Sequence, residues 1–413
     1  MTVAEDTVLP FQLPIDWQAT YVGTEFFLIL GKMLDAEKNV GVPRPYLGNK
    51  SVQWGCIDTE DLSLIKLTPG DLRRYRLMDG DLLVCEGGDI GRSAIWRGQL
   101  EECYFQKALH RVRPRGGFSP VLLRYLLEYY SKTGFLLNFA TQTSIAHLPK
   151  DKFEVLPLPK PPMVEQEAIA EALSDADALI EGLERLIAKK RLIKQGAMQD
   201  LLTAKRRLPG FSGEWTEAKL GAISRIITGP FGTLLKASEY GGKDGVPLIP
   251  VGEVRDGYFR ITSETPRIST EVLKRLPQYI LRKGDIVFGR KGGVERSSIV
   301  TDDQVGWFLG SDGIVVRFHE RFNADFFGHL VRSPKVKEFL LMNALGTTMP
   351  SLNQSVLGAV PIQYPGEEEQ SAISGILADM DTEIQALETR LEKARQVKEG
   401  MMQNLLTGRI RLV

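Results

Sequence analysis

Cysteine and histidine are scarce in this chain of 413 residues, which holds three and four of them. Cys56, Cys85 and Cys103 are odd in number and have no paired spacing. A disulfide framework is therefore excluded, and reduced thiols in a cytoplasm are expected. The four histidines do not cluster with the cysteines, so we expect no metal site.

Long apolar runs are missing as well. No run approaches the ~18 residues of a membrane-spanning helix, and residues 1–10 contain Glu5 and Asp6 but no basic residue, unlike a secretory signal. The composition, with 43% hydrophobic and 25% charged residues, is that of an ordinary globular protein. The length predicts two or more domains. We expect a cytoplasmic protein without a membrane partner.

An excess of charge of one sign is also absent, because the chain has 52 basic and 52 acidic residues. The charge is nevertheless segregated along the chain. Residues 204–356 contain 22 Lys and Arg against 16 Asp and Glu, whereas residues 154–203 and 357–413 each contain 6 against 9. A basic segment suits a phosphate backbone, and acidic segments suit a protein partner or solvent.

Catalytic motifs are lacking too. The chain has no Asn/Asp-Pro-Pro-Tyr/Phe run, which amino-methyltransferases use to hold a flipped base, and no Gly-x-Gly turn between a strand and a helix. Gly87–Ser93 imitates a phosphate-binding loop but has the wrong spacing and Arg in place of Lys, so a hairpin turn is predicted. Glu217–Lys219 matches half of a nuclease motif and is interpreted as a surface strand. We therefore expect no catalysis by this chain alone.

Two long helical segments dominate what is present. Residues 165–203 are apolar at two positions of a seven-residue repeat, which predicts a helix that pairs with another helix along its length. We call these two rows of apolar positions the seam, and Lys190 and Lys194 are its charged interruptions. Residues 369–407 repeat the segment at an offset of 204, with 19 of 39 positions identical. The chain is therefore an internal duplication, and we expect the two helices to form an antiparallel coiled coil.

The segments before each helix are predicted to be mixed α/β lobes. Strands are expected at 81–85 and 94–96, a helix at 120–130, and glycine turns between them. The offset of 204 relates Gly80-Asp81 to Gly284-Asp285 and Val112-Arg113 to Val316-Arg317, whereas the loops differ. The predicted fold class is α+β with a pseudo-twofold internal repeat. Its domains are a lobe at 1–153, a helical segment at 154–205, a lobe at 206–356 and a helical segment at 357–413.

This layout resembles the specificity (S) subunit of type I restriction-modification enzymes. The resemblance covers the whole chain and is most specific in the helices, which open with Glu-Gln (Glu165, Glu369) and end with Met-x-x-Leu-Leu-Thr (Met198–Thr203, Met402–Thr407). The loop Thr228–Gly232 of the second lobe is also similar to that family, whereas the first lobe lacks it.

The resemblance implies a chain without chemistry of its own. Each lobe would be a target-recognition domain that reads one half of a split double-stranded DNA sequence, and the helices would set the distance between the halves. Two modification subunits, which methylate adenine with S-adenosylmethionine, would dock on the helices and adjoining lobes. Restriction subunits, which use ATP and Mg, would join that core.

Candidate DNA-binding residues are Arg, Lys, Asn, Glu and Ser/Thr side chains and glycines on loops, because base edges and phosphates need such groups. In the first lobe they are Tyr46, Asn49, Lys50, Glu86, Gly87, Gly88, Asp89, Arg92, Thr143 and Ser144. In the second lobe they are Gly229, Pro230, Phe231, Gly232, Lys236, Glu253, Arg290, Lys291, Arg296, Thr347 and Thr348.

Several alternatives stay open at this level. Arg92 and Arg296 are also interpreted as members of a fold-holding ion pair, because both lobes have them, and Asp175, Asp177 and their repeats as partner contacts or solvated positions. Alternative functions are a recognition subunit of a related restriction system that cuts on both sides of its site, a self-sufficient adenine DNA methyltransferase, and a coiled-coil scaffold without a DNA role.

Overall fold

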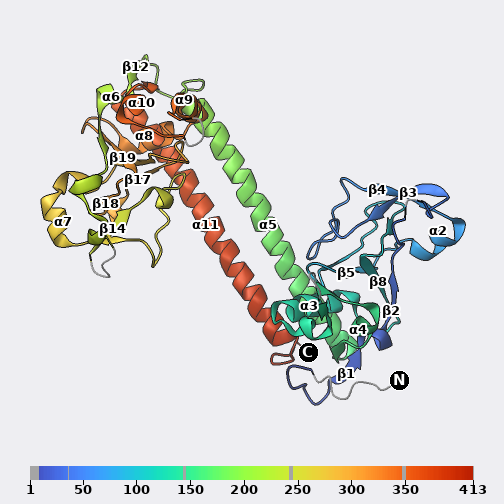
Figure 1. Cartoon of the computed structure of the whole chain (residues 1–413). Coiled ribbons are helices and arrows are strands. Elements are labelled where there is room, and N and C mark those ends of the chain that lie inside the picture. The colour runs from blue at the N-terminus through green and yellow to red at the C-terminus, as the bar shows by residue number, and fades with distance from the viewer. Residues whose placement is uncertain (1–8, 36, 143–145, 241–244, 347–349, 413) are drawn as a thin grey trace. The chain divides into compact units, whose positions relative to one another are not determined.

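The computed structural model of the chain describes residues 9–35, 37–142, 146–240, 245–346 and 350–412. Contacts between segments divide the chain into unit 1, Met1–Glu184 with Thr389–Val413, and unit 2, Arg185–Glu388. Both boundaries fall inside long helices, so each unit combines one lobe with parts of two helices. The two units are described one at a time below, with their elements labelled in Figure 1.

Unit 1 is built on two small sheets with short helices around them. The strand orders are β2-β8-β5-β6, all antiparallel, and β4-β3-β7, with β1-β11 and β9-β10 as two-stranded pairs. The strands are β1 (Gln18–Tyr21), β2 (Phe26–Leu30), β3 (Val42–Leu47), β4 (Ser63–Leu67), β5 (Leu82–Cys85), β6 (Ser93–Ile95), β7 (Tyr104–Phe105), β8 (Leu109–Pro114), β9 (Thr141–Gln142), β10 (Ala146–His147) and β11 (Pro157–Lys160). The helices of the lobe are α1 (Val22–Glu25), α2 (Pro69–Tyr75), α3 (Pro120–Lys132), η1 (Phe135–Phe139) and α4 (Lys150–Glu154).

Local signals explain the placement of the expected elements. Every residue of β5 is buried, because sheet neighbours and α3 cover it. Helix α3 begins with Pro120 at its first position, and the Ser119 hydroxyl accepts a hydrogen bond from the backbone N–H of Leu122. The predicted strands at 81–85 and 94–96 and the helix at 120–130 are confirmed, with shifts of one or two residues at their ends.

Unit 2 repeats this arrangement. The strand orders are β13-β19-β16-β17, β15-β14-β18 and β12-β20, the same sequence of pairings as in unit 1. The strands are β12 (Thr216–Lys219), β13 (Ser224–Thr228), β14 (Val246–Ile249), β15 (Arg267–Ile268), β16 (Ile286–Gly289), β17 (Ser297–Ile299), β18 (Phe308–Leu309), β19 (Gly313–Phe318) and β20 (Pro361–Tyr364). The helices are α6 (Leu220–Ile223), η2 (Gly232–Leu234), η3 (Ala237–Glu239), η4 (Val251–Glu253), α7 (Thr270–Arg275), η5 (Pro277–Tyr279), η6 (Asp302–Gln304), α8 (Ala324–Leu330), α9 (Pro334–Asn343) and α10 (Gln354–Gly358). The mixed α+β class is confirmed, and Glu217–Lys219 lies on a mostly exposed strand as predicted.

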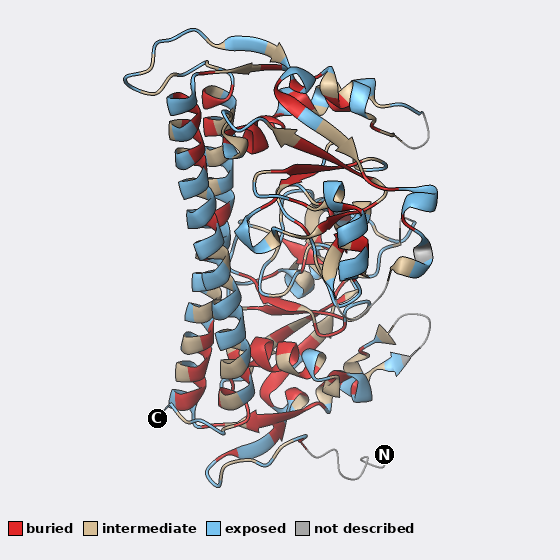
Figure 2. Ribbon diagram, turned by 90° about the vertical axis from the view of Figure 1, so that its left-hand side faces the viewer, coloured by how far each residue is buried: buried red, intermediate tan, exposed pale blue. Residues whose placement is uncertain are grey.

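The two long helices are α5 (Met163–Leu201) and α11 (Glu367–Leu405). Their expected seam residues are buried or half-buried, and their other faces are largely exposed (Figure 2). At the lobe ends the seam merges with the lobe core: Ile169 and Leu173 pack into the core of unit 1, and Ile373 and Leu377 into that of unit 2. Lobe and helix thus share one hydrophobic core in each unit. No helix in the described ranges is long and apolar enough to cross a membrane.

Ion pairs join α5 and α11 in each unit. In unit 1, Arg395 contacts Glu184 at 2.5 Å and Lys398 contacts Asp177 at 2.7 Å. The residue number rises along one helix as it falls along the other, so the two segments run in opposite directions. In unit 2 the same pairs recur at the offset of 204, as Arg191 with Glu388 at 2.5 Å and Lys194 with Asp381.

Acidic side chains of α11 form ion pairs with the two lysines in the seam of α5. Lys194 pairs with Asp381, and Lys190 lies 2.6 Å from Glu383. Both acids are about half exposed. The charged interruptions therefore gain partners on the opposite helix while keeping contact with water, so they cost the seam little.

Candidate nucleic-acid interface

A buried ion pair fixes the strands behind the candidate loops of each lobe. In unit 1 the Arg113 guanidinium on β8 donates two hydrogen bonds of 2.7 Å to Asp81, which precedes β5. In unit 2, Arg317 donates to Asp285 at 2.7 and 2.6 Å. Both carboxylates are about 1% exposed, and a two-point Arg–carboxylate pair fixes geometry as well as charge. This ion pair recurs in both lobes, and it lies at the start of β5 or β16, at the end of the strand opposite the turn that follows it.

The structure brings the turn after β3 together with the hairpin between β5 and β6 in unit 1. Asn49 Nδ2 donates to the Gly87 carbonyl at 3.0 Å, and Arg92 Nη2 donates to the Asn49 carbonyl at 2.9 Å. The Arg92 side chain therefore joins the hairpin to the backbone of the turn after β3. It forms no ion pair in the described part of the chain. The ion-pair interpretation of Arg92 is wrong.

The two glycines of this hairpin are required by close packing and backbone geometry. A side chain at Gly87 would come within 2.9 Å of His147 Nδ1, because the hairpin pairs with β10 at that point. Gly88 has φ of +82°, a left-handed conformation that favours glycine. Gly87–Ser93 is thus the predicted hairpin turn. Thr143 and Ser144, just before β10, lie outside the described residues.

The remaining described candidates of the first lobe are Lys50 and Tyr46. Lys50 is exposed beside Asn49. Tyr46 is half-buried and packs against a small hydrophobic core formed by Ile65, Leu67 and Tyr104. Within the described residues, no hydrogen bond or ion pair joins Tyr46 to the hairpin.

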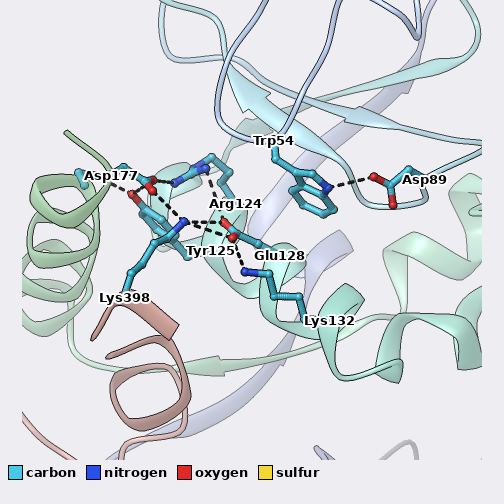
Figure 3. A network of polar contacts seen from close by, with 9 residues as sticks. Trp54, Asp89, Arg124, Tyr125, Glu128, Lys132, Asp177 and Lys398 are labelled. Carbon is cyan, nitrogen blue, oxygen red and sulfur yellow. Dashed lines mark hydrogen bonds and ion pairs between the residues drawn. The ribbon is translucent and has the colours of Figure 1, made fainter. Parts of the chain in front are cut away.

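The structure adds a partner for the candidate residue Asp89 that the sequence did not indicate. The Trp54 indole N–H donates to Asp89 Oδ2 at 2.9 Å, between a loop after β3 and the tip of the hairpin (Figure 3). Asp89 itself is exposed. The two residues are 35 positions apart, and no repeat or spacing connects them, so only the fold reveals the pair.

In the second lobe the structure brings Phe231 and Arg290 together. Phe231 is 61% exposed, and the Arg290 guanidinium lies 5.9 Å from the centre of its ring, within cation–π range. Gly229 lets the loop backbone pass close to Gly310, since a Cβ there would lie 1.9 Å from the Gly310 carbonyl oxygen. Pro230 is buried and Gly232 has φ of +65°. The loop therefore presents an exposed aromatic ring beside a cation.

Lys291 lies next to this pair on the turn between β16 and β17. It is exposed and contacts Asp312 at 3.4 Å, and its backbone pairs with Ser351. The bridge of Lys291 with Ser351 is the repeat of the bridge of Gly87 with His147. The two hairpins thus occupy the same place in their lobes and carry different side chains.

Among the residues that the structure describes, no side-chain hydrogen bond or ion pair joins Lys236, Glu253 or Arg296 to this group. Lys236 is exposed, and Glu253 faces Arg260 at 3.6 Å. Arg296 is exposed, and its charged partner is its neighbour Glu295 at 3.8 Å, so its interpretation as a fold-holding ion pair is also wrong. Thr347 and Thr348 lie outside the described residues.

A polar network joins the first lobe to both long helices in unit 1 (Figure 3). Asp177 on α5 accepts hydrogen bonds from Arg124 at 2.6 Å and from Tyr125 at 2.8 Å, and Lys398 of α11 contacts Asp177 and Glu128. Burial opposes ionisation of Asp177, but the hydrogen bond from Lys398 and the charges of Arg124 and Lys398 outweigh it and lower its pKa. Asp177 is therefore an internal link between the lobe and the two long helices. Asp175 is exposed.

A second pair joins the two helices at each lobe. Arg411, beyond the end of α11, donates to Glu165 Oε2 at 2.7 Å and to Asp16, and the Trp17 indole also donates to Glu165, at 2.9 Å. Arg207 and Glu369 form the repeat of this pair in unit 2. The Glu of the repeated Glu-Gln motif thus accepts from an Arg that follows the other helix, which explains why the motif occurs at both helix starts.

Comparison with known proteins agrees with this architecture. The family model described as "Type I restriction modification DNA specificity domain" matches residues 22–189 and 212–396. The chain is 27% identical to the type I restriction enzyme MjaVIII specificity subunit of Methanocaldococcus jannaschii, over 97% of this chain and 94% of that protein. It is 22% identical to the type I restriction enzyme StySPI specificity subunit of Salmonella potsdam, over 97% and 89%.

A solved structure shows the same fold. The S subunit of the type I restriction-modification system from M. genitalium aligns with a TM-score of 0.61 at 16% identity, covering 98% of this chain and 99% of that one. Since the family model matches most of the chain in two successive segments, this protein belongs to the type I restriction-modification DNA specificity family and carries two copies of its domain.

Proposed function

We propose that this chain is the DNA-reading specificity subunit of a type I restriction-modification enzyme and has no chemistry of its own. Each lobe, 1–153 and 206–356, is the target-recognition domain for one half of a bipartite sequence. The segments 154–205 and 357–413 form an antiparallel coiled coil with pseudo-twofold symmetry that sets the spacing. The complex acts in the cytoplasm.

The observation that carries the proposal is the pair of equivalent hairpins with different side chains. The Asp–Arg pair and the sheets behind them repeat at the offset of 204. The hairpin of the first lobe carries Asp89 and Arg92, and that of the second carries Arg290 and Lys291 beside Phe231. A repeated frame with divergent polar loops is what two independent base-reading surfaces require.

The proposal assigns the chemistry to partner subunits. Two modification subunits dock on the exposed helix faces and adjoining lobes and transfer a methyl group from S-adenosylmethionine to adenine. Restriction subunits add ATP- and Mg-dependent translocation and cleavage. The acidic helical segments suit such docking, since residues 154–203 and 357–413 each have three more acidic than basic residues.

The test is to produce the chain with and without its modification subunits in a methylation-free host and to map methyladenine across the genome. We expect a bipartite motif with an unspecified spacer when the subunits are present, and no methylation by the chain alone. Methyl transfer to plasmid DNA by the purified chain would contradict the assignment and favour a self-sufficient methyltransferase. Absence of any motif with all subunits present would favour a scaffold without a DNA role.

A further inference from the structure

We propose that Asp89 reads one base of the first half-site as a hydrogen-bond acceptor and that Trp54 positions its carboxylate. The inference rests on the proposed function, because it names a specificity-determining residue of the first lobe. Asp89 lies at the tip of the hairpin that carries Gly87, Gly88 and Arg92, and its side chain is exposed.

The Asp89 carboxylate is oriented but not neutralised. The Trp54 indole N–H donates a hydrogen bond of 2.9 Å to Asp89 Oδ2. Oδ1 and further lone pairs therefore remain available to accept hydrogen bonds. No ion pair of Asp89 occurs among the residues that the structure describes. Its backbone carbonyl accepts from the Arg92 N–H at 3.2 Å, which closes the turn below the side chain. The charge is therefore held in place by a neutral donor and remains available to a ligand.

The loop that carries Trp54 packs against the network that joins the first lobe to the helices. Trp54 is followed by Gly55, whose N–H donates to the Ser93 carbonyl at 3.0 Å and whose φ is +79°. A side chain at Gly55 would come within 2.7 Å of Arg124 Nη1, so the loop rests on that guanidinium. Arg124 is bound to Asp177 of α5, and Figure 3 shows the Trp54–Asp89 pair beside this network. The loop that positions the carboxylate thus rests on a guanidinium that is also bound to α5.

The chemistry of a carboxylate on DNA restricts what Asp89 recognises. An ionised carboxylate only accepts hydrogen bonds and is repelled by phosphates, so a backbone contact is unfavourable. The donors on base edges in the major groove are the amino groups of cytosine N4 and adenine N6, whereas guanine O6 and thymine O4 are acceptors. The pairing that carboxylates make in the major groove is with the cytosine N4 amino group, so Asp89 selects cytosine at one position.

The hairpin of the second lobe has no carboxylate at the position equivalent to Asp89. The residue at the offset of 204 is Gly293, and the charged side chains on that hairpin are Arg290, Lys291 and Glu295, the last of which contacts Arg296. Arg and Lys donate to guanine O6 and N7. The inference therefore applies to one half-site only, and the other half-site of the same DNA provides an internal control.

The experiment replaces Asp89 by Asn in the full chain, produced with its modification subunits, and maps methyladenine across the host genome. D89N keeps an oxygen for Trp54 and offers an N–H₂ donor to the base. We expect methylation of the original motif to fall about tenfold or more. We also expect adenine, guanine or thymine to be accepted at one position of one half-site, because asparagine both accepts and donates, with the other half-site unchanged. The control E101Q removes an exposed carboxylate elsewhere in the same lobe and should leave the motif unchanged.

The outcomes separate the inference from the proposed function. A wild-type chain that yields no bipartite motif overturns the proposed function. The reading role of Asp89 is overturned if the D89N enzyme methylates the wild-type motif as the wild type does. It is also overturned if D89N methylates that motif less but shows the same base preference. W54F tests the positioning role: we expect weaker discrimination at the same base position, and an unchanged preference in W54F beside a changed one in D89N overturns that role.

Discussion

At the scale of single residues, the two helix ends show how one position differs between the repeats. Ala204 and Gly408 are equivalent, and both have left-handed backbones, with φ of +56° and +71°. The helix termini use the same hydrogen bonds, from Arg206 N–H to the Asp200 carbonyl and from Ile410 N–H to that of Asn404. This conformation suits glycine, and alanine is strained in it.

We predict opposite effects for exchanging these two residues. Ala204→Gly should stabilise unit 2 by about 1 kcal/mol, because it removes the Cβ strain. Gly408→Ala should destabilise unit 1 by about 2 kcal/mol or more, since its Cβ would also lie 2.4 Å from Pro14 Cγ. Differential scanning calorimetry of the full chain measures both. Equal shifts of the same sign would contradict the assignment of strain to Ala204.

His329 makes unit 2 sensitive to acid. It lies buried on α8 where the first lobe has Tyr125, and Arg332 donates to its Nδ1, at 3.1 Å. Burial lowers its pKa to about 3, aided by the charges of Arg332 and Lys194 and opposed by Asp381. The folded-state value lies below the ordinary 6.5, so the unfolded chain binds the proton first. The stability that neutral His329 contributes is complete above pH 6.5 and falls as the pH falls toward 3.

We therefore predict that H329Q flattens the pH dependence of unit 2. Between about pH 6.5 and 5 the wild type should lose up to about 1.4 kcal/mol per pH unit through this residue. Urea unfolding at several pH values, followed by a probe in unit 2, measures the slope. The comparison is His110 in unit 1, whose pKa is lowered to about 4 by burial. H329Q should leave the contribution of His110 to the pH dependence of stability unchanged. An identical slope in H329Q and wild type would exclude His329 as the cause.

At the scale of elements, Asp177 links helix α3 of the first lobe to α5 and α11. Asp177→Asn would remove one of the two carboxylates that Arg124 and Lys398, 7% and 13% exposed, share, and would leave them Glu128. We predict a loss of about 2 kcal/mol, below the range for a fully buried pair because Asp177 is 35% exposed. Urea unfolding of unit 1 measures it.

The neighbouring Asp175 is the matched control, since it lies on the same helix, is exposed and is also repeated in α11. Asp175→Asn should change stability by less than about 0.5 kcal/mol. If both substitutions cost the same, the network around Asp177 is not the source of the loss.

At the scale of the whole molecule, the proposed spacer role predicts a change of DNA target with helix length. The ion pairs tie α5 to α11 in both units, so both helices have to be lengthened together. Seven residues inserted after Gly182 and seven after Ala386 keep the seam in register and add about 10 Å. Since DNA rises about 3.4 Å per base pair, we predict a spacer longer by up to about three base pairs with both half-sites retained.

Methylation mapping of this variant with its modification subunits measures the spacer. A three-residue insertion at the same points rotates the seam away from its partner and should reduce assembly, which makes it the control for register. Retained half-sites with an unchanged spacer would show that the partner subunits, and not the helices, set the separation.

The sequence predicted the periodic features well and the long-range polar contacts poorly. The long helices start two residues earlier than expected, at Met163 and Glu367, and the hairpin at Gly87–Ser93 lies where it was predicted. The pairs Asp81–Arg113 and Asp285–Arg317 were visible as matched positions of the repeat, but nothing in the sequence joined each Asp to its Arg. That contact depends on the register of β5 with β8, where Leu82 pairs with Val112.

The sequence by itself determined the duplication, the two helices and their seam, because each rests on a periodic or repeated pattern that local backbone geometry converts directly into structure. Only the tertiary structure decided which polar side chains meet. It assigned Asp177 to an internal network, Arg92 to a backbone carbonyl and Asp89 to Trp54. Such contacts join residues tens of positions apart, and the packing of loops on the sheets decides their geometry, for which a single sequence carries no periodic signal.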